Sequence, residues 1–197
     1  MKERKIEPIF TDEKKWKFNS CLNTYNESIY SDGYLLAANK LIKGLINNSS
    51  DQDYLIYPII FLYRHHIELI LKEIKKECLI YEENKNKNEK KDHKLIDLWE
   101  YIKPVANDFF DNEYAGQDKN KLHMDYIEHV INEITMIDDS STEFRYPRHK
   151  NGKKTLKGIT HINFLRMANH MTNLSEDLIT ILSCINEYNR LKLENNY

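Results

Sequence analysis

Glycine and proline are unusually scarce in this chain of 197 residues, which has five glycines and four prolines. Average usage would put roughly 12 % of residues in these two types. Both supply the backbone angles that tight turns require. A β-sandwich, a β-barrel or a propeller needs many such turns, so the scarcity excludes these classes. We therefore expect an all-α fold in which long helices are joined by few connections.

Size, charge and cysteine content indicate one ordinary globular domain in a reducing cytoplasm. A mass of 23.6 kDa fits a single domain, and the net charge of −2 gives no global basic field for nucleic acid. The N-terminus has no apolar signal-peptide core, and the longest apolar run, 54–63, is too short to span a membrane. The three cysteines form no metal or disulfide pattern: Cys21, Cys78 and Cys184.

Apolar periodicity predicts a bundle of four to five long helices within residues 28–197. The expected helices cover about residues 31–47, 56–78, 94–102, 118–137 and 164–185. Ser31 or Asp32 is expected to cap the first helix, and Asp118 the fourth. The third helix is expected to break or kink near Pro104. In the fourth helix, Leu122, Tyr126, Val130, Ile134 and Ile137 are expected to share one face.

The remaining segments are expected to be connections. Residues 1–27 form an arm or a short helix around Trp16 and Phe18, and residues 83–93 form a flexible linker. Residues 138–160 are the longest non-helical stretch, and Asn151-Gly152 is a dipeptide typical of hairpins. This stretch is therefore expected to be a short β-ribbon or an ordered loop before the last helix.

Charged and titratable side chains interrupt the most apolar helix, where Arg64, His65, His66 and Glu68 follow one another closely. Arg64, Glu68 and Lys72 recur every four residues and so share one helix face. One interpretation is a structural ladder of ion pairs along a partly exposed edge. The other is a polar cleft in which Arg64 binds a phosphate and a histidine moves a proton.

A second cluster is basic. Residues 145–157 hold six Lys or Arg side chains and His149 but no acid. Such a patch suits a nucleic-acid backbone, and Phe144 and Tyr146 could stack on an unpaired base. The alternative is a solvated basic loop whose charge is partly paired by Asp138, Asp139 and Glu143. The expected contacts to nucleic acid are Arg148, Lys150, Lys153, Lys154 and Lys157.

Metal and cofactor motifs are weak or missing. Asp125 and His129 share a helix face, but there is no HExxH pair, Gly-rich phosphate loop or G-x-S-x-G motif. The sequence predicts neither a metal nor a cofactor.

Three motifs together resemble the HEPN-like superfamily, small bacterial all-helical proteins often linked to anti-phage or abortive-infection loci. They are Tyr63-Arg64-His65-x-x-Glu68-Leu69-x-x-Lys72, His93-Lys94-Leu95-x-x-Leu98-Trp99 and Phe144-Arg145-Tyr146-Pro147, spread over about residues 30–185. The resemblance implies a helical bundle, commonly dimeric, in a superfamily where many members are metal-independent endoribonucleases.

The chain departs from that superfamily at its usual catalytic motif, an arginine followed after four to six residues by a histidine. The nearest matches are Arg145-x-x-x-His149 and Arg166-x-x-x-His170, one residue too short. The residues that coincide with the resemblance are therefore the expected catalytic set: Arg64, His65, Glu68, His93 and Arg145.

Three functions follow as hypotheses, and the third of them is RNA or DNA binding through residues 145–157. The first is an RNA-directed effector or toxin-type protein of bacterial defence, in which a histidine takes the 2′-hydroxyl proton and an arginine stabilises the phosphorane charge. The second is a non-catalytic helical module that forms a dimer or holds a partner, such as an antitoxin protein. The expected partners are a second copy, RNA or such a protein, and no membrane. The site would lie between the basic segment and the 64–68 helix.

Overall fold

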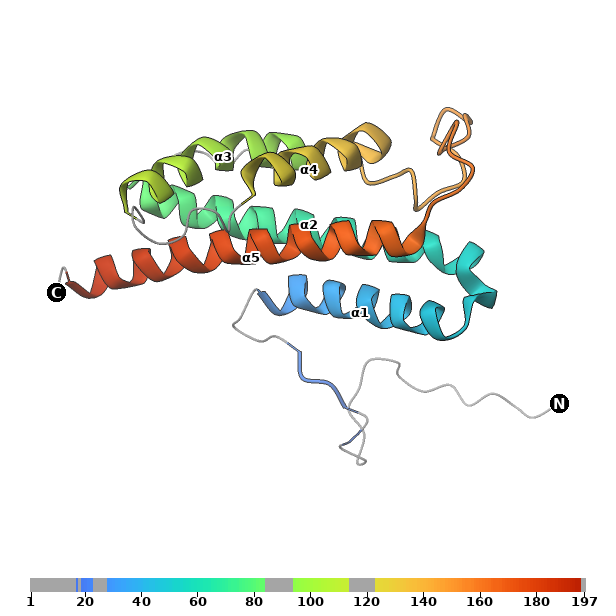
Figure 1. Ribbon diagram of the computed structural model, residues 1–197, viewed down its shortest axis with the longest axis horizontal. Helices are drawn as coiled ribbons and strands as arrows, with labels where there is room; N and C mark the ends of the chain where they lie inside the picture. Colours follow the sequence, from blue (N-terminus) through green and yellow to red (C-terminus); the bar gives the residue numbers. More distant parts are fainter. Residues whose placement is uncertain (1–16, 18, 23–27, 84–93, 114–122, 196–197) are drawn as a thin grey trace.

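The chain folds as an all-helical bundle in the computed structural model, which describes residues 17, 19–22, 28–83, 94–113 and 123–195 (Figure 1). Within these ranges there is no β-strand, so the expected all-α class is confirmed. The elements are α1 (Ser28–Asn47), the 3-10 turn η2 (Ser49–Asp51), α2 (Gln52–Tyr81), α3 (Leu95–Asn112), α4 (Met124–Asp138) and α5 (Phe164–Asn195). Within them, no helix has the length and apolarity needed to cross a bilayer.

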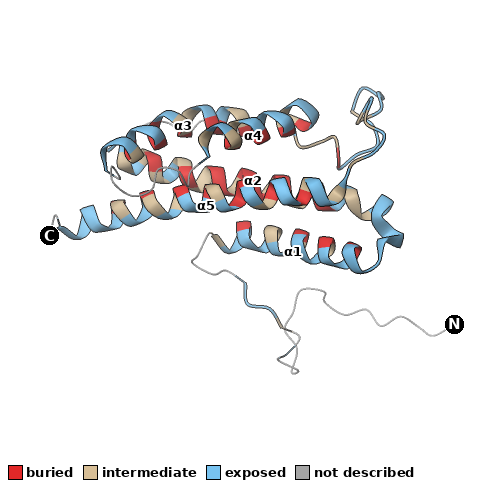
Figure 2. Ribbon diagram, viewed as in Figure 1, coloured by how far each residue is buried: buried red, intermediate tan, exposed pale blue. Residues whose placement is uncertain are grey.

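Helix α2 is the centre of the bundle. It packs against α1, α3 and α5, and buried residues occur on most of its faces (Figure 2). The sequence explains this position, because the helix carries apolar residues around much of its circumference and such a helix is stable only when neighbours enclose it. The apolar residues that recur every three or four positions from Ile60 onward are all buried: Ile60, Tyr63, Ile67, Ile70, Ile74 and Cys78.

Helices α1 and α5, which both pack against α2, run in opposite directions. The connection from α1 is only a few residues long, so α1 is antiparallel to α2. Helix α5 is parallel to α2, because His66 contacts Ser175 near the middle and Glu77 contacts Asn189 further along both helices. The chain reaches this parallel arrangement through α3 and α4, which lie together on another side of α2 (Figure 1).

The predicted helix boundaries needed several corrections. Helix α1 ends at Asn47 as expected but begins at Ser28, so Ser31 is not its cap. Ser31 lies buried inside the first turn, where its hydroxyl donates to the Ser28 carbonyl (3.1 Å). Helix α3 continues past Pro104 to Asn112. The helix persists there because the residues after Pro104 bury Val105, Ala106 and Phe109 against the core.

The predicted face of helix α4 is largely confirmed, because Val130 and Ile134 are buried and Tyr126 packs against the core. Ile137 is exposed, and Ile127, Ile131 and Asp138 are buried in addition. The buried face is therefore wider than predicted, and it ends on Asp138 instead of Ile137. The proposed start at Asp118, with Leu122, lies outside the described residues, as do residues 1–16 with Trp16, Phe18, most of the 83–93 linker and His93.

Residues 139–163 form an ordered loop at one end of the bundle, between α4 and α5 (Figure 1). The β-ribbon alternative is reduced to one antiparallel bridge between Arg148 and Lys154. The chain reverses at Asn151-Gly152, and Gly152 has the positive φ (+81°) that this turn requires. The Gly152 amide donates to the His149 carbonyl at 2.9 Å, which closes the turn.

Candidate functional site

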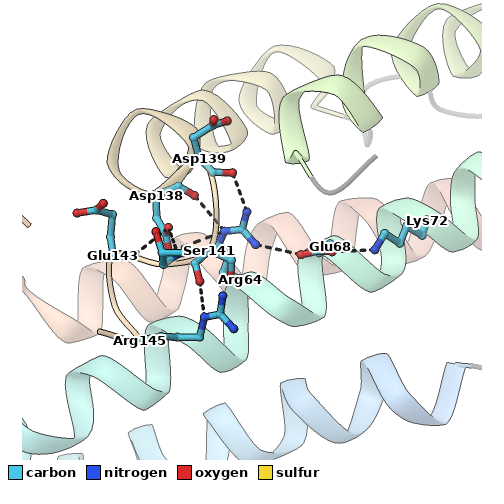
Figure 3. A network of polar contacts seen from close by, with 9 residues as sticks. Arg64, Glu68, Lys72, Asp138, Asp139, Ser141, Glu143 and Arg145 are labelled. Atoms are coloured by element: carbon cyan, nitrogen blue, oxygen red, sulfur yellow. Dashed lines mark hydrogen bonds and ion pairs between the residues drawn. The ribbon is translucent and has the colours of Figure 1, made fainter. Parts of the chain in front are cut away.

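Arg64 is the most deeply buried charge of the site, with 1 % of its surface exposed. Its Nε donates to the Asp138 carbonyl (3.1 Å), Nη2 to the Asp139 carbonyl (3.2 Å) and Nη1 to Glu68 Oε2 (3.0 Å). Glu68 in turn accepts from Lys72 Nζ at 2.7 Å (Figure 3). The ion-pair ladder of the first interpretation is present, but Arg64 and Glu68 are buried rather than on a partly exposed edge, because the end of α4 covers Arg64.

The last residue of α4 organises the start of the loop. Asp138 is buried, and its Oδ1 accepts from the backbone amides of Thr142 (2.7 Å) and Glu143 (3.1 Å). A carboxylate at the end of a helix commonly accepts hydrogen bonds from nearby backbone amides that have no partner within the helix. Arg64 holds the carbonyl of the same residue, so α2 and the loop are joined through Asp138.

Glu143 continues the internal framework of the loop. One carboxylate oxygen accepts from the Leu156 amide (2.7 Å), and the other lies 3.0 Å from His149 Nε2. Of the three acids expected to neutralise the basic segment, Glu143 alone pairs with it in the described structure. Asp138 pairs with Arg64, and Asp139 pairs with Lys94 at 2.6 Å.

His65 is half-buried, whereas the adjacent His66 is fully buried. Its ring stacks on Phe61 (centroids 5.7 Å apart, 11° between planes) and meets the edge of Tyr34 at 4.4 Å. Burial lowers the pKa of His65 below its ordinary value of 6.5; Glu68 opposes this, and the positive charges of Lys72, Arg64 and Arg145 reinforce it. The imidazole is therefore neutral at pH 7 and can accept a proton.

Arg145 reaches the same aromatic ring from the loop. Its guanidinium carbon lies 5.5 Å from the centre of Phe61 and 5.4 Å from the centre of Tyr146. Its Nε donates to the Ser141 carbonyl (Figure 3), and the side chain is otherwise exposed. Phe61 is thus a common contact of His65 and Arg145, whereas Arg64 and Glu68 are buried. Sequence reasoning missed Phe61, although its position four residues before His65 on a helix predicts the contact.

The other histidines near the predicted motifs are already engaged. His66 lies between the Ser31 carbonyl and the Ser175 hydroxyl and is fully buried. His149 pairs with Glu143, and His170 Nδ1 lies 2.9 Å from Tyr126 Oη. The two shortened Arg-x-x-x-His motifs therefore have their histidines in contacts unrelated to Phe61.

The basic side chains of the loop face solvent. Arg148 donates to the Gly152 carbonyl (3.0 Å) and remains exposed. The four lysines are exposed and form no ion pair within the described part of the chain: Lys150, Lys153, Lys154 and Lys157. A strip of positive charge therefore begins beside Arg145 and follows the loop.

The described ranges hold no group of three or more His, Cys, Asp or Glu side chains arranged to bind a metal ion. Comparisons of the chain with protein-family models, with curated proteins and with solved structures find no match.

Proposed function

We propose that this protein is an RNA-directed, HEPN-like effector of bacterial defence that cleaves RNA without a metal, using His65 and Arg145. One observation carries the proposal. A neutral, partly accessible histidine and an exposed arginine both contact the Phe61 ring, and the loop that carries this arginine also carries exposed lysines with no ion pair among the described residues.

The chemistry needs no further group. His65 takes the proton of a ribose 2′-hydroxyl, and the oxygen attacks the adjacent phosphorus. The Arg145 guanidinium stabilises the negative charge that develops on the phosphorane. The bond from phosphorus to the 5′-oxygen then breaks, this oxygen takes a proton from water, and the remaining hydroxide takes the proton that His65 holds. The products are a 2′,3′-cyclic phosphate and a 5′-hydroxyl, and His65 is neutral again. Arg64 acts as a positioning residue, because it fixes the Asp138 and Asp139 carbonyls from which the loop begins.

The test is cleavage of a fluorescently labelled single-stranded RNA in EDTA. The unaltered protein should cut the strand, and His65→Gln should reduce the rate by about 10²- to 10⁴-fold, the usual contribution of a general base. His129→Gln, an exposed histidine on α4, is the matched control and should cut normally. RNA that stays intact at high protein concentration, or full activity in His65→Gln, would contradict the proposal.

A second candidate is the non-catalytic module that binds a second copy or a partner protein. It is favoured by exposed apolar side chains along α1, which include Ile29, Tyr30, Leu36 and Ile46. In this case His65→Gln would leave the cellular effect of the protein unchanged, so the same variant distinguishes the two functions.

A further inference from the structure

An open hollow lies where the first turns of α2 face the basic loop. Its volume is about 610 Å³, within the range of small-molecule sites, roughly 300–1,000 Å³. Three aromatic and three cationic side chains line it, and no acid does: Tyr57, Phe144, Tyr146, Arg145, Arg148 and Lys154. Aromatic rings and positive charges therefore line the same hollow. They match a ligand that contains both a planar ring and an anionic group.

The hollow extends further along α2. A neighbouring hollow of about 400 Å³ shares Tyr57, Phe144, Leu156 and Ile159 with it. Phe144 is nearly buried at 8 % exposure, whereas Tyr57 is 46 % and Tyr146 is 54 % exposed. Phe144 therefore forms a buried part of the hollow, and Tyr57 and Tyr146 are accessible rings on which a planar group can stack.

We propose that this hollow binds one unpaired nucleotide of an RNA strand. The base stacks against Tyr57 or Tyr146, and the neighbouring phosphates contact Arg145, Arg148 and Lys154. A base within a duplex is paired and stacked on its neighbours, so only a single-stranded or extruded nucleotide can enter. The inference rests on the proposed function and specifies its substrate as single-stranded RNA.

Arg145 connects this hollow to the proposed reaction site. Arg145 lines the hollow, and its guanidinium lies over Phe61, on which His65 stacks. A nucleotide held in the hollow therefore places its phosphate near His65, and base binding positions the strand for cleavage.

The experiment measures binding by fluorescence anisotropy, with His65→Gln as the background so that the RNA stays intact. The probes are a labelled eight-nucleotide RNA containing all four bases and an abasic strand of equal length. Tyr57→Ser should weaken binding of the RNA by about tenfold or more and leave the abasic strand unaffected. Tyr54→Ser is the control, because Tyr54 lies on the same helix, is 77 % exposed and lines neither hollow.

Each contrary result has a distinct meaning. Equal weakening of both strands, or equal effects of Tyr57→Ser and Tyr54→Ser, would overturn the base site while cleavage through His65 could still stand. A selective Tyr57→Ser effect in a protein that cleaves no RNA would support the base site and overturn the nuclease. AMP that competes as tightly as the RNA would overturn the assignment to a strand in favour of a free nucleotide. Absence of RNA binding would overturn both proposals.

Discussion

The hydrogen-bond partners of the buried His66 determine which of its two ring nitrogens carries the proton. Nδ1 lies 2.9 Å from the Ser31 carbonyl, which can only accept, so Nδ1 carries the proton. Nε2 then accepts from the Ser175 hydroxyl at 2.8 Å. The neutral ring thus joins α1, α2 and α5, and a second proton would remove the acceptor that Ser175 uses.

This arrangement predicts a pH-dependent stability. Burial lowers the pKa of His66 below its ordinary value of 6.5, and the opposing effects of the Ser31 carbonyl and Asp32 are smaller. The unfolded chain therefore binds a proton more readily, and the stabilisation is complete above pH 6.5 and declines as the pH falls below it. His66→Gln should lower the unfolding free energy most at pH 8. The difference in unfolding free energy between this variant and the unaltered protein should shrink by up to about 1.4 kcal/mol per pH unit below 6.5.

Urea denaturation at pH 8, 7, 6 and 5 measures this effect. His65→Gln is the comparison, since His65 is only half-buried and should give a smaller change. A deficit for His66→Gln that is the same at every pH would show that the buried ring does not titrate in this way.

At the residue scale, the sequence identified Arg64, His65 and Arg145 as special but could not tell which of them meet solvent. Consecutive residues on a helix point about 100° apart, so Arg64, His65 and His66 point in different directions. The neighbour that encloses Arg64 is the end of α4, 74 residues away in the sequence. No local pattern specifies that contact.

At the scale of elements, the Arg64 network ties the middle of α2 to the end of α4 and to the loop. Arg64→Ala would remove the guanidinium that pairs with the buried Glu68 carboxylate and that donates to the Asp138 and Asp139 carbonyls. We expect a loss of about 3–5 kcal/mol in unfolding free energy, the usual effect of removing one partner of a buried ion pair. Urea midpoints measure the loss.

The control for this prediction is Arg190→Ala, which removes exposed ion pairs with Glu187 and Glu194. Its midpoint should hardly change, because solvent screens such pairs. If the two variants were equally stable, the enclosed network would have no structural importance and Arg64 would be free for another role.

The helices themselves were largely predictable, because their apolar stripes recur with the helical period and do face the core. Their ends were not. Helix α1 starts early because Ser31 is covered by α2, and α3 passes Pro104 because its later turns pack on the core. The sequence predicts either a β-ribbon or an ordered loop for residues 138–160. The hydrogen bonds that Asp138 and Glu143 accept from backbone amides hold this segment as an irregular loop. Such contacts depend on packing rather than on neighbouring residues.

At the scale of the whole molecule, a net charge of −2 conceals a strongly uneven distribution. The lysines of the loop carry their charge at one end of the bundle. If RNA binds there, the logarithm of its binding constant should fall linearly with the logarithm of salt concentration, by about 0.7 for each phosphate contact. The double variant Lys153→Glu and Lys154→Glu should weaken binding and make this slope shallower by about 1.4.

The matched control reverses two exposed lysines on α1, Lys40→Glu and Lys43→Glu. This variant has the same net charge as the loop variant, so it separates local contact from overall repulsion. Identical slopes for the two double variants, measured between about 50 and 200 mM salt, would contradict binding by the loop.

The parallel pairing of α2 with α5 also affects how the chain reaches its fold. Glu77 and Asn189 touch across 112 residues, so the central helix meets one of its main partners last during synthesis. Until residues 164–195 leave the ribosome, the apolar side of α2 that faces α5 has no cover. Contacts between such distant segments form slowly, and uncovered apolar surface promotes aggregation. A chain that stops before α5 would thus be a substrate for chaperones and proteases.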